Sequence, residues 1–255
     1  MNIVVCLKQT FDTEERIVIK DNRISEDGVE FVINPYDEYA VEEAIKLRDE
    51  HGGEVTVVTI GPERAEQALR TALAMGADKA VIVDDESLFG DEYTAATVLA
   101  AVIKKVEFDI ILCGNVAVDD GSGQVGPRLA EALNIPHITT ITKLEVEGSN
   151  VRVERDVEGD SEIITATLPI LVTAQQGLNE PRYPSLPGIM KAKKKPMDRY
   201  SASDLGLDAG SVKAKTEQLD VFLPPKKESG RIFQGDLSSQ VKELGQLLHN
   251  EAKVL

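Results

Sequence analysis

The sequence predicts an α/β fold in which a parallel sheet is covered by helices on both faces. Short runs rich in valine and isoleucine are apolar on both faces, as expected of buried parallel strands. They lie at residues 2–8, 54–60, 79–84 and 108–113. Amphipathic helical periods separate these runs, at residues 36–50, 63–75 and 92–105. Strands that alternate with helices in this way predict a Rossmann-like parallel sheet.

The first expected helix has clear start signals. Asn34 belongs to the residue types that cap helices, and Pro35 suits the first helical position. Asp37 and Glu38 then place negative charge beside the positive end of the helix dipole. We therefore expect a helix that begins at Pro35, with the Asn34 side chain as its cap.

Antiparallel additions interrupt the alternation. A hairpin-like insert, with strands at 16–20 and 23–31, turns at Asp21-Asn22 before the first helix. Residues 138–157 indicate two antiparallel strands that turn at 147–150. Residues 162–174 indicate one or two more strands, so an antiparallel β extension follows the parallel sheet.

The last 55 residues have a different character. From Tyr200 the chain is polar and is broken by glycine and proline, and it contains one amphipathic helix near 237–249. Such a segment has little core of its own. We expect an α/β domain over residues 1–200 and an extended C-terminal arm over 201–255 that wraps a partner subunit.

Composition excludes several classes of protein. The formal net charge is −16, so the surface as a whole repels nucleic acid and anionic lipid. No apolar run approaches the ~20 residues of a membrane-spanning helix, and residues 2–7 form a strand-like run where a signal peptide needs a basic region. We expect a cytoplasmic protein that neither binds nucleic acid nor inserts into a membrane.

Cysteine and histidine usage points to no metal site. Cys6 and Cys113 each lie inside an apolar run, which favours small buried hydrophobes over a redox or metal role. His51, His137 and His249 have no second ligand at the usual spacing.

A glycine-rich run, Gly121-Ser122-Gly123-Gln124-Val125-Gly126, matches the G-x-G-x-x-G pattern but is a weak dinucleotide signal. Seven residues, 114–120, separate it from its strand, and no acidic strand end follows ~20 residues later. One interpretation is that the glycines only permit a flexible turn. The alternative is that backbone N–H groups at Gly123–Gly126, at the positive end of the next helix, bind a phosphate.

Several loops are expected to meet at the carboxyl edge of the sheet, where ligands bind in open α/β folds. These are Cys6–Lys8, Thr59–Gly61 and Gly114–Gly126, beside the helix start at Asn34–Asp37. They predict a mononucleotide site in which Asp119 and Asp120 hold ribose hydroxyls, because carboxylates repel phosphate. The alternatives for this pair are an acid–base role or a solvated pair.

Motifs for catalysis and for triphosphate binding are missing. The chain has no G-x-x-x-x-G-K-[ST] loop, no Ser/His/Asp or Cys/His set that its spacing supports, and no lysine beside the glycines. We therefore expect a binding protein without catalytic residues of its own.

Five segments together carry a family resemblance. They are LKQTFDTE near the start, NPYDEYAVEEAIKLRDE at 34–50, TALAMGADKA at 71–80, AVDDGSGQVGPRLAE at 117–131 and NEPRYPSLPGIMKAKKKP at 179–196. In this order they resemble the β subunit of electron-transfer flavoproteins, and the resemblance covers roughly residues 1–200. The last segment is the most specific of the five.

The resemblance implies a heterodimer in which an α subunit holds most of the redox-active FAD and this chain buries a structural AMP. In that family the AMP pocket is formed by positions that match Cys6, Asn34, Pro35, Tyr36, Asp37, Ile60, Asp119, Asp120, Gly121, Ser122, Gly123, Gln124, Val125 and Gly126. Phe11, Asp12 and Thr13 match a loop that comes near the flavin, although the aromatic residue of some relatives is absent at Thr13.

The resemblance also implies electron transport partners. Acyl-CoA dehydrogenases of fatty acid β-oxidation would deliver electrons, and a membrane quinone oxidoreductase would receive them. One alternative is an electron-bifurcating member, in which a second FAD replaces AMP. Another is a stand-alone adenine-nucleotide-binding module of the stress-protein type, which leaves residues 179–196 and the arm unexplained.

Residues 179–196, which we name the recognition segment, are basic in an acidic chain. Five basic residues and no acidic one lie between Arg182 and Met197, and four prolines prevent a continuous helix. The resemblance implies a docking loop for partner dehydrogenases. Its predicted contacts are Tyr183, Leu186, Ile189 and Met190, with Lys191, Lys193, Lys194 and Lys195 attracting acidic surfaces. The alternative is that the apolar residues pack beneath the loop.

Overall fold

The computed structural model describes residues 1–227 and 229–255. The chain forms two compact units. The first comprises Met1–Val18 and Ile24–Leu219, and the second comprises Ile19–Arg23 and Asp220–Leu255.

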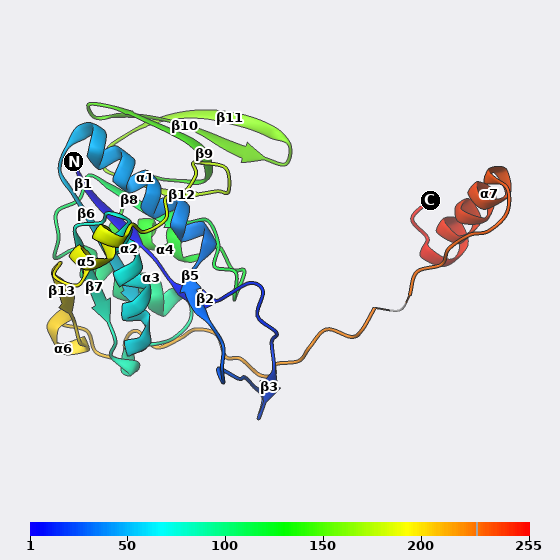
Figure 1. Cartoon of the computed structure of the whole chain (residues 1–255), viewed down its shortest axis with the longest axis horizontal. Helices are drawn as coiled ribbons and strands as arrows, with labels where there is room; N and C mark the ends of the chain where they lie inside the picture. The colour runs from blue at the N-terminus through cyan, green and yellow to red at the C-terminus, as the bar shows by residue number, and fades with distance from the viewer. Residues whose placement is uncertain (228) are drawn as a thin grey trace. The chain divides into compact units, whose positions relative to one another are not determined.

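A nine-stranded sheet forms the centre of the first unit, in the order β11-β10-β9-β12-β8-β1-β6-β7-β13 (Figure 1). Its strands are β1 (Asn2–Cys6), β6 (Glu54–Ile60), β7 (Lys79–Val83), β8 (Ile110–Gly114), β9 (His137–Glu147), β10 (Asn150–Val157), β11 (Asp160–Thr167), β12 (Ile170–Ala174) and β13 (Met197–Arg199). All neighbours from β9 to β13 are parallel, and β10 and β11 extend the sheet antiparallel at one edge. The α/β fold with an antiparallel extension is confirmed.

Helices cover both faces of the sheet. Alternate residues of β1 belong to two separate cores: Ile3 and Val5 pack with α1 (Pro35–His51), α2 (Glu66–Met75) and α5 (Leu186–Ala192). Val4 and Cys6 pack on the other face with α3 (Glu92–Ile103), α4 (Val125–Leu133) and α6 (Ala202–Leu205). The three expected helices correspond to α1, to a short 3₁₀ turn (Glu63–Ala65) followed by α2, and to α3.

The strand order reverses beside β1. The chain places β6 and β7 on one side of β1 and β8 on the other. The loops that follow β1 and β8 therefore leave the sheet in opposite directions, which opens a crevice at their carboxyl ends. This crevice is the place where the sequence predicts a ligand.

The expected hairpin insert turns where predicted, but its strands are shorter than the expected 16–20 and 23–31. Asp21 and Asn22 have φ of 50° and 57°, and they join β3 (Ile19–Lys20) to β4 (Arg23–Ile24). Two consecutive left-handed residues match the twist of a two-residue hairpin turn. A second small sheet pairs β2 (Gln9–Phe11) with β5 (Phe31–Ile33), which leads into α1.

Residues 162–174 form two strands with different environments. β11 is mostly exposed and lies at the sheet edge, whereas all five residues of β12 are buried between β8 and β9. The apolar run ILVTA at 170–174 explains the central position of β12, because a central parallel strand is covered on both faces.

The first unit continues beyond residue 200. Leu205 and Val212 are buried in the core that α3 and α4 share. In the second unit, α7 (Leu237–Leu247) leads into a short π-helical turn (Leu248–Ala252), and α7 has no buried residue. No described helix combines the length and the apolar character needed to cross a membrane.

Candidate nucleotide site

A cavity of about 470 Å³ opens at the carboxyl edge of the sheet, beside the point where the strand order reverses. The ends of β1, β6 and β8 form its floor, and the start of α1, residues 88–91 with the first residue of α3 and the loop after β8 form its walls. Its volume lies within the range of small-molecule sites.

The cavity collects most of the predicted nucleotide-site residues. Its lining includes Cys6, Asn34, Asp37, Ile60, Asp120, Ser122, Gly123, Gln124, Val125 and Gly126. Four predicted residues, Pro35, Tyr36, Asp119 and Gly121, do not line it. Pro35 opens α1, Tyr36 borders a separate polar hollow, and Gly121 supplies a left-handed turn at φ 68°.

Asp37 joins the two strands that flank the crevice. One carboxylate oxygen accepts the backbone N–H of Lys8 at 2.6 Å, just after β1, and the other accepts the N–H of Gly114 at 3.0 Å, at the end of β8. A Cβ on Gly114 would lie 2.2 Å from the Asp37 carboxylate, so only glycine permits this approach. Burial raises the pKa of Asp37 to about 7, although the two N–H groups oppose the shift.

The prediction that the Asn34 side chain caps α1 is wrong. Asn34 occupies the position before the helix, but its amide makes no capping bond. Instead Nδ2 donates to the carbonyl of Val116 at 2.9 Å, and Oδ1 accepts the N–H of Val118 at 3.1 Å. Because a distant loop offers both a donor and an acceptor, the side chain fixes that loop against the start of α1.

The loop after β8 ends at a set of free backbone donors. α4 begins at Val125, and no side chain caps its first turn. In the described part of the chain, no protein acceptor takes the N–H groups of Gly123, Gln124, Val125 or Gly126. A Cβ on Gly126 would lie 2.8 Å from the methyl group of Thr173, so glycine lets α4 approach β12. These donors suit an anion at the positive helix end.

Lys8 was missed by the sequence prediction, which found no lysine beside the glycines. Its Nζ lies 2.7 Å from Oδ1 of Asp119 and 2.9 Å from Oδ2 of Asp120. More than a hundred residues separate Lys8 from this pair, so only the neighbouring positions of β1 and β8 bring them together. The position of Lys8 at a strand end facing the predicted site was the available signal.

The residues before α3 were also missed. Leu88, Phe89, Gly90 and Asp91 line the cavity, and Asp91 caps α3 by accepting the N–H groups of Tyr93 and Thr94. The sequence carried a capping signal at Asp91, but nothing in it placed this turn beside the glycine-rich loop.

The two cysteines behave as small apolar residues. Cys6 and Cys113 are register partners on β1 and β8, are buried, and belong to one core. The neighbouring Cys6 thiol, together with burial, raises the pKa of Cys113, so its thiol stays protonated. Among the described residues, no group of three or more potential ligands is arranged to hold a metal ion.

The residues predicted near a flavin lie outside the cavity. Phe11 belongs to β2 and its ring lies 5.1 Å from the ring of Phe31. Asp12 accepts the N–H of Glu14, and Thr13 is exposed in the following turn. They form a separate surface of the first unit.

The recognition segment presents apolar side chains to solvent. The exposed fractions are 95% for Tyr183, 82% for Leu186, 66% for Met190 and 42% for Ile189. Ser185 caps the short helix α5 by accepting the N–H of Gly188, and Ala192 anchors α5 in the core. The exposure excludes the alternative in which these side chains pack beneath the loop.

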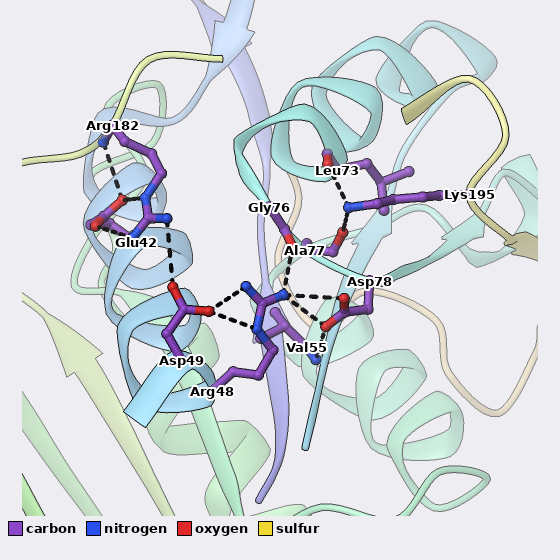
Figure 2. A network of polar contacts seen from close by, with 10 residues as sticks. All are labelled: Glu42, Arg48, Asp49, Val55, Leu73, Gly76, Ala77, Asp78, Arg182 and Lys195. Carbon is purple, nitrogen blue, oxygen red and sulfur yellow. Dashed lines mark hydrogen bonds and ion pairs between the residues drawn. The ribbon is translucent and has the colours of Figure 1, made fainter. Parts of the chain in front are cut away.

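Both ends of the recognition segment are fixed to the scaffold (Figure 2). The Arg182 guanidinium contacts the buried Glu42 carboxylate of α1 with two bonds of 2.7 and 2.9 Å. At the other end, Nζ of Lys195 donates to the carbonyl of Leu73 in the last turn of α2 and to that of Ala77 just after the helix. The exposed tip is therefore held between two anchors.

Lys195 differs from the other predicted lysines. Its half-buried ammonium group binds main-chain carbonyls, and burial lowers its pKa. Lys191, Lys193 and Lys194 are exposed. The charge available to an acidic partner thus comes from these three lysines.

Comparisons with known proteins give one consistent family. Residues 21–205 match the electron transfer flavoprotein domain. The chain is 59% identical to the electron transfer flavoprotein subunit beta of Bacillus subtilis (strain 168) over the full length of both chains. It is 36% identical to the human electron transfer flavoprotein subunit beta, over 97% of this chain and 99% of that one. It is 38% identical to the caffeyl-CoA reductase-Etf complex subunit CarD of Acetobacterium woodii, over 94% and 95%.

Proposed function

This chain belongs to the electron transfer flavoprotein family as a β subunit, and we propose that it is the nucleotide-binding and docking half of a heterodimeric electron carrier. In this proposal an α subunit holds most of the FAD, which supplies the one- and two-electron chemistry. The β chain binds AMP as a structural ligand. Electrons pass from acyl-CoA dehydrogenases through the flavin to a membrane quinone oxidoreductase.

The cavity beside β1 and β8 is the main support for the proposal that this chain binds a nucleotide. Its free N–H groups at Gly123–Gly126 suit a single phosphate at the start of α4, and its apolar wall from Ile60, Leu88 and Leu99 suits a base. Asp120 lies at the same loop, where a carboxylate accepts hydrogen bonds from ribose hydroxyls. This donor set fits a monophosphate, because α4 is the one described helix starting at the cavity that has no acidic residue in its first turn, whereas α1 begins with Asp37 and Glu38 and α3 begins with Glu92.

The recognition segment supports the proposal that dehydrogenases dock on this chain. Leu186 and Met190 are large apolar residues held exposed between two anchors, and exposed Lys191, Lys193 and Lys194 lie beside them. An apolar anchor with a charged rim is the usual composition of a binding hot spot. We place the contact with acyl-CoA dehydrogenases here.

Other surfaces complete the proposed heterodimer. Leu237, Val241 and Leu244 of α7 are exposed, and the arm that carries them would cover the α subunit. The surface around Phe11, Asp12 and Thr13 would lie toward the flavin. A stand-alone nucleotide-binding module would instead purify without a flavin-containing partner, so co-purification of a yellow complex distinguishes the two functions.

The docking proposal is tested by Leu186→Ala in the heterodimer. We expect slower electron transfer from an acyl-CoA dehydrogenase, by about tenfold or more if Leu186 is a hot spot, because its truncation removes an apolar anchor. Flavin content and subunit association should not change. Ile163→Ala is the matched control, since Ile163 is an exposed residue on β11 at the far edge of the sheet. Unchanged transfer in Leu186→Ala would show that Leu186 is not the anchor.

A further inference from the structure

We propose that Lys8 determines the specificity of the cavity for an anionic nucleotide, by neutralising the acidic pair Asp119 and Asp120 at its rim. The inference rests on the proposed nucleotide site and gives Lys8 a role in ligand selection there. Lys8 acts here through charge compensation rather than through contact with the phosphate.

The charge of the cavity lining motivates the inference. Besides Asp37, whose burial favours its protonated form, the carboxylates of Asp91, Glu92 and Asp120 line the cavity, and Lys8 is the only lysine or arginine of the described chain that does so. Burial alone would raise the pKa of Asp91, but backbone N–H groups of Thr94, Lys215 and Thr216 lower it, so Asp91 stays charged. A cavity with this surplus of carboxylates repels a phosphate.

The main chain of Lys8 is fixed on both sides. Its N–H donates to Asp37 at 2.6 Å, and its carbonyl accepts the N–H of Asn34 at 2.9 Å. The side chain therefore starts from a defined point at the end of β1 and reaches the loop after β8. Its ammonium group contacts both carboxylates at once, at 2.7 and 2.9 Å.

Lys8 remains charged when it makes these contacts. Burial alone would lower its pKa, but the hydrogen bonds and charges of Asp119 and Asp120 raise it overall. The Lys8 ammonium thus offsets part of the negative charge of the two carboxylates at the rim, which reduces the electrostatic repulsion of an incoming phosphate.

The ion pairs themselves contribute little to folding. The side chains are 42% exposed for Lys8, 26% for Asp119 and 39% for Asp120, and pairs of this exposure are screened by water. Asp120 also accepts the N–H of Ser122 at 2.9 Å, and Asn34 binds Val116 and Val118 of the same loop, so the loop keeps these contacts without Lys8. A variant at Lys8 therefore reports on ligand binding more than on the fold.

The experiment compares AMP with adenosine, which has the same base and ribose but no phosphate. Equilibrium binding of both ligands is measured on the full chain freed of nucleotide, with circular dichroism and thermal unfolding as checks of the fold. The variants are Lys8→Met, which keeps the apolar stem, and Lys8→Arg, which keeps the charge. A triple variant, Lys8→Met with Asp119→Asn and Asp120→Asn, removes the lysine together with the charges that it neutralises.

In Lys8→Met, the dissociation constant for AMP should rise about tenfold more than that for adenosine. The affinity for AMP divided by that for adenosine should therefore fall in Lys8→Met. Lys8→Arg should keep the wild-type value of this ratio, and the triple variant should return toward it. An unchanged ratio in Lys8→Met would overturn the inference. A ratio that stays low in the triple variant would also overturn it, because Lys8 would then contact the phosphate. A wild-type chain that binds neither ligand would instead contradict the nucleotide site itself.

Discussion

At the scale of single residues, Asp37 connects the fold to the site. Its two carboxylate oxygens hold the ends of β1 and β8 at the position where the sheet order reverses. The same residue lines the cavity and is only 5% exposed. A buried carboxylate is costly when charged, and here burial outweighs the nearby Lys8 charge, so protonation of Asp37 couples the packing of the crevice to pH.

This coupling predicts a pH dependence of stability. Burial raises the pKa of Asp37 from 3.8 to about 7, so the folded state binds the proton more tightly than the unfolded chain. The resulting stabilisation is fully present below about pH 4 and is lost as the pH rises to about 7, with a slope of up to about 1.4 kcal/mol per pH unit. In urea unfolding across this window, Asp37→Asn should show a free energy of unfolding that falls less steeply than in the wild type. Parallel curves would contradict the assignment.

The structural role of a residue was predictable from the sequence where its neighbours along the chain determine that role. The start of α1 at Pro35 and the left-handed turn at Asp21-Asn22 follow from residue type alone. The partners of Asn34 and Lys8 did not follow, because each binds a loop more than eighty residues away. Such polar contacts depend on the order of the strands, which no local pattern specifies.

At the scale of elements, the recognition segment combines fixed ends with an exposed tip. Arg182 binds the buried Glu42 of α1, and Asn179 donates to the carbonyl of Tyr39 in the same helix. Lys195 satisfies carbonyls at the end of α2, where helical carbonyls lack partners within the helix. The exposure of the tip was predictable from its prolines. The binding of main-chain carbonyls by Lys195 was not, because the sequence does not distinguish one lysine of the KAKKK run from another.

The difference between these lysines gives a paired prediction. Lys195→Met should lower the free energy of unfolding by about 1–2 kcal/mol, because it leaves the carbonyls of Leu73 and Ala77 without this donor. It should leave the rate of association with an acidic dehydrogenase unchanged. Lys193→Met should do the opposite: normal stability, with association slowed about threefold at low salt and less at high salt. Stopped-flow association and urea unfolding separate the two, and equal effects of both variants would contradict the division of roles.

At the scale of the whole molecule, the two units serve different purposes. The first unit contains both hydrophobic cores, the cavity and the recognition segment. In the second unit, α7 has an apolar side and no buried residue. The α/β class was predictable because strand and helix periods alternate without ambiguity. The central place of β12 and the extension of the first unit to Leu219 required knowledge of which apolar residues meet across the sheet.

The ligand content of the heterodimer tests whether the cavity of this chain holds AMP. The chain, co-expressed with its α subunit, is purified, denatured and separated from its released ligands, which are identified and counted by chromatography and mass spectrometry. We predict one FAD and one AMP for each heterodimer, because the start of α4 offers free N–H groups to a single phosphate in the cavity. Two FAD molecules and no AMP would contradict it.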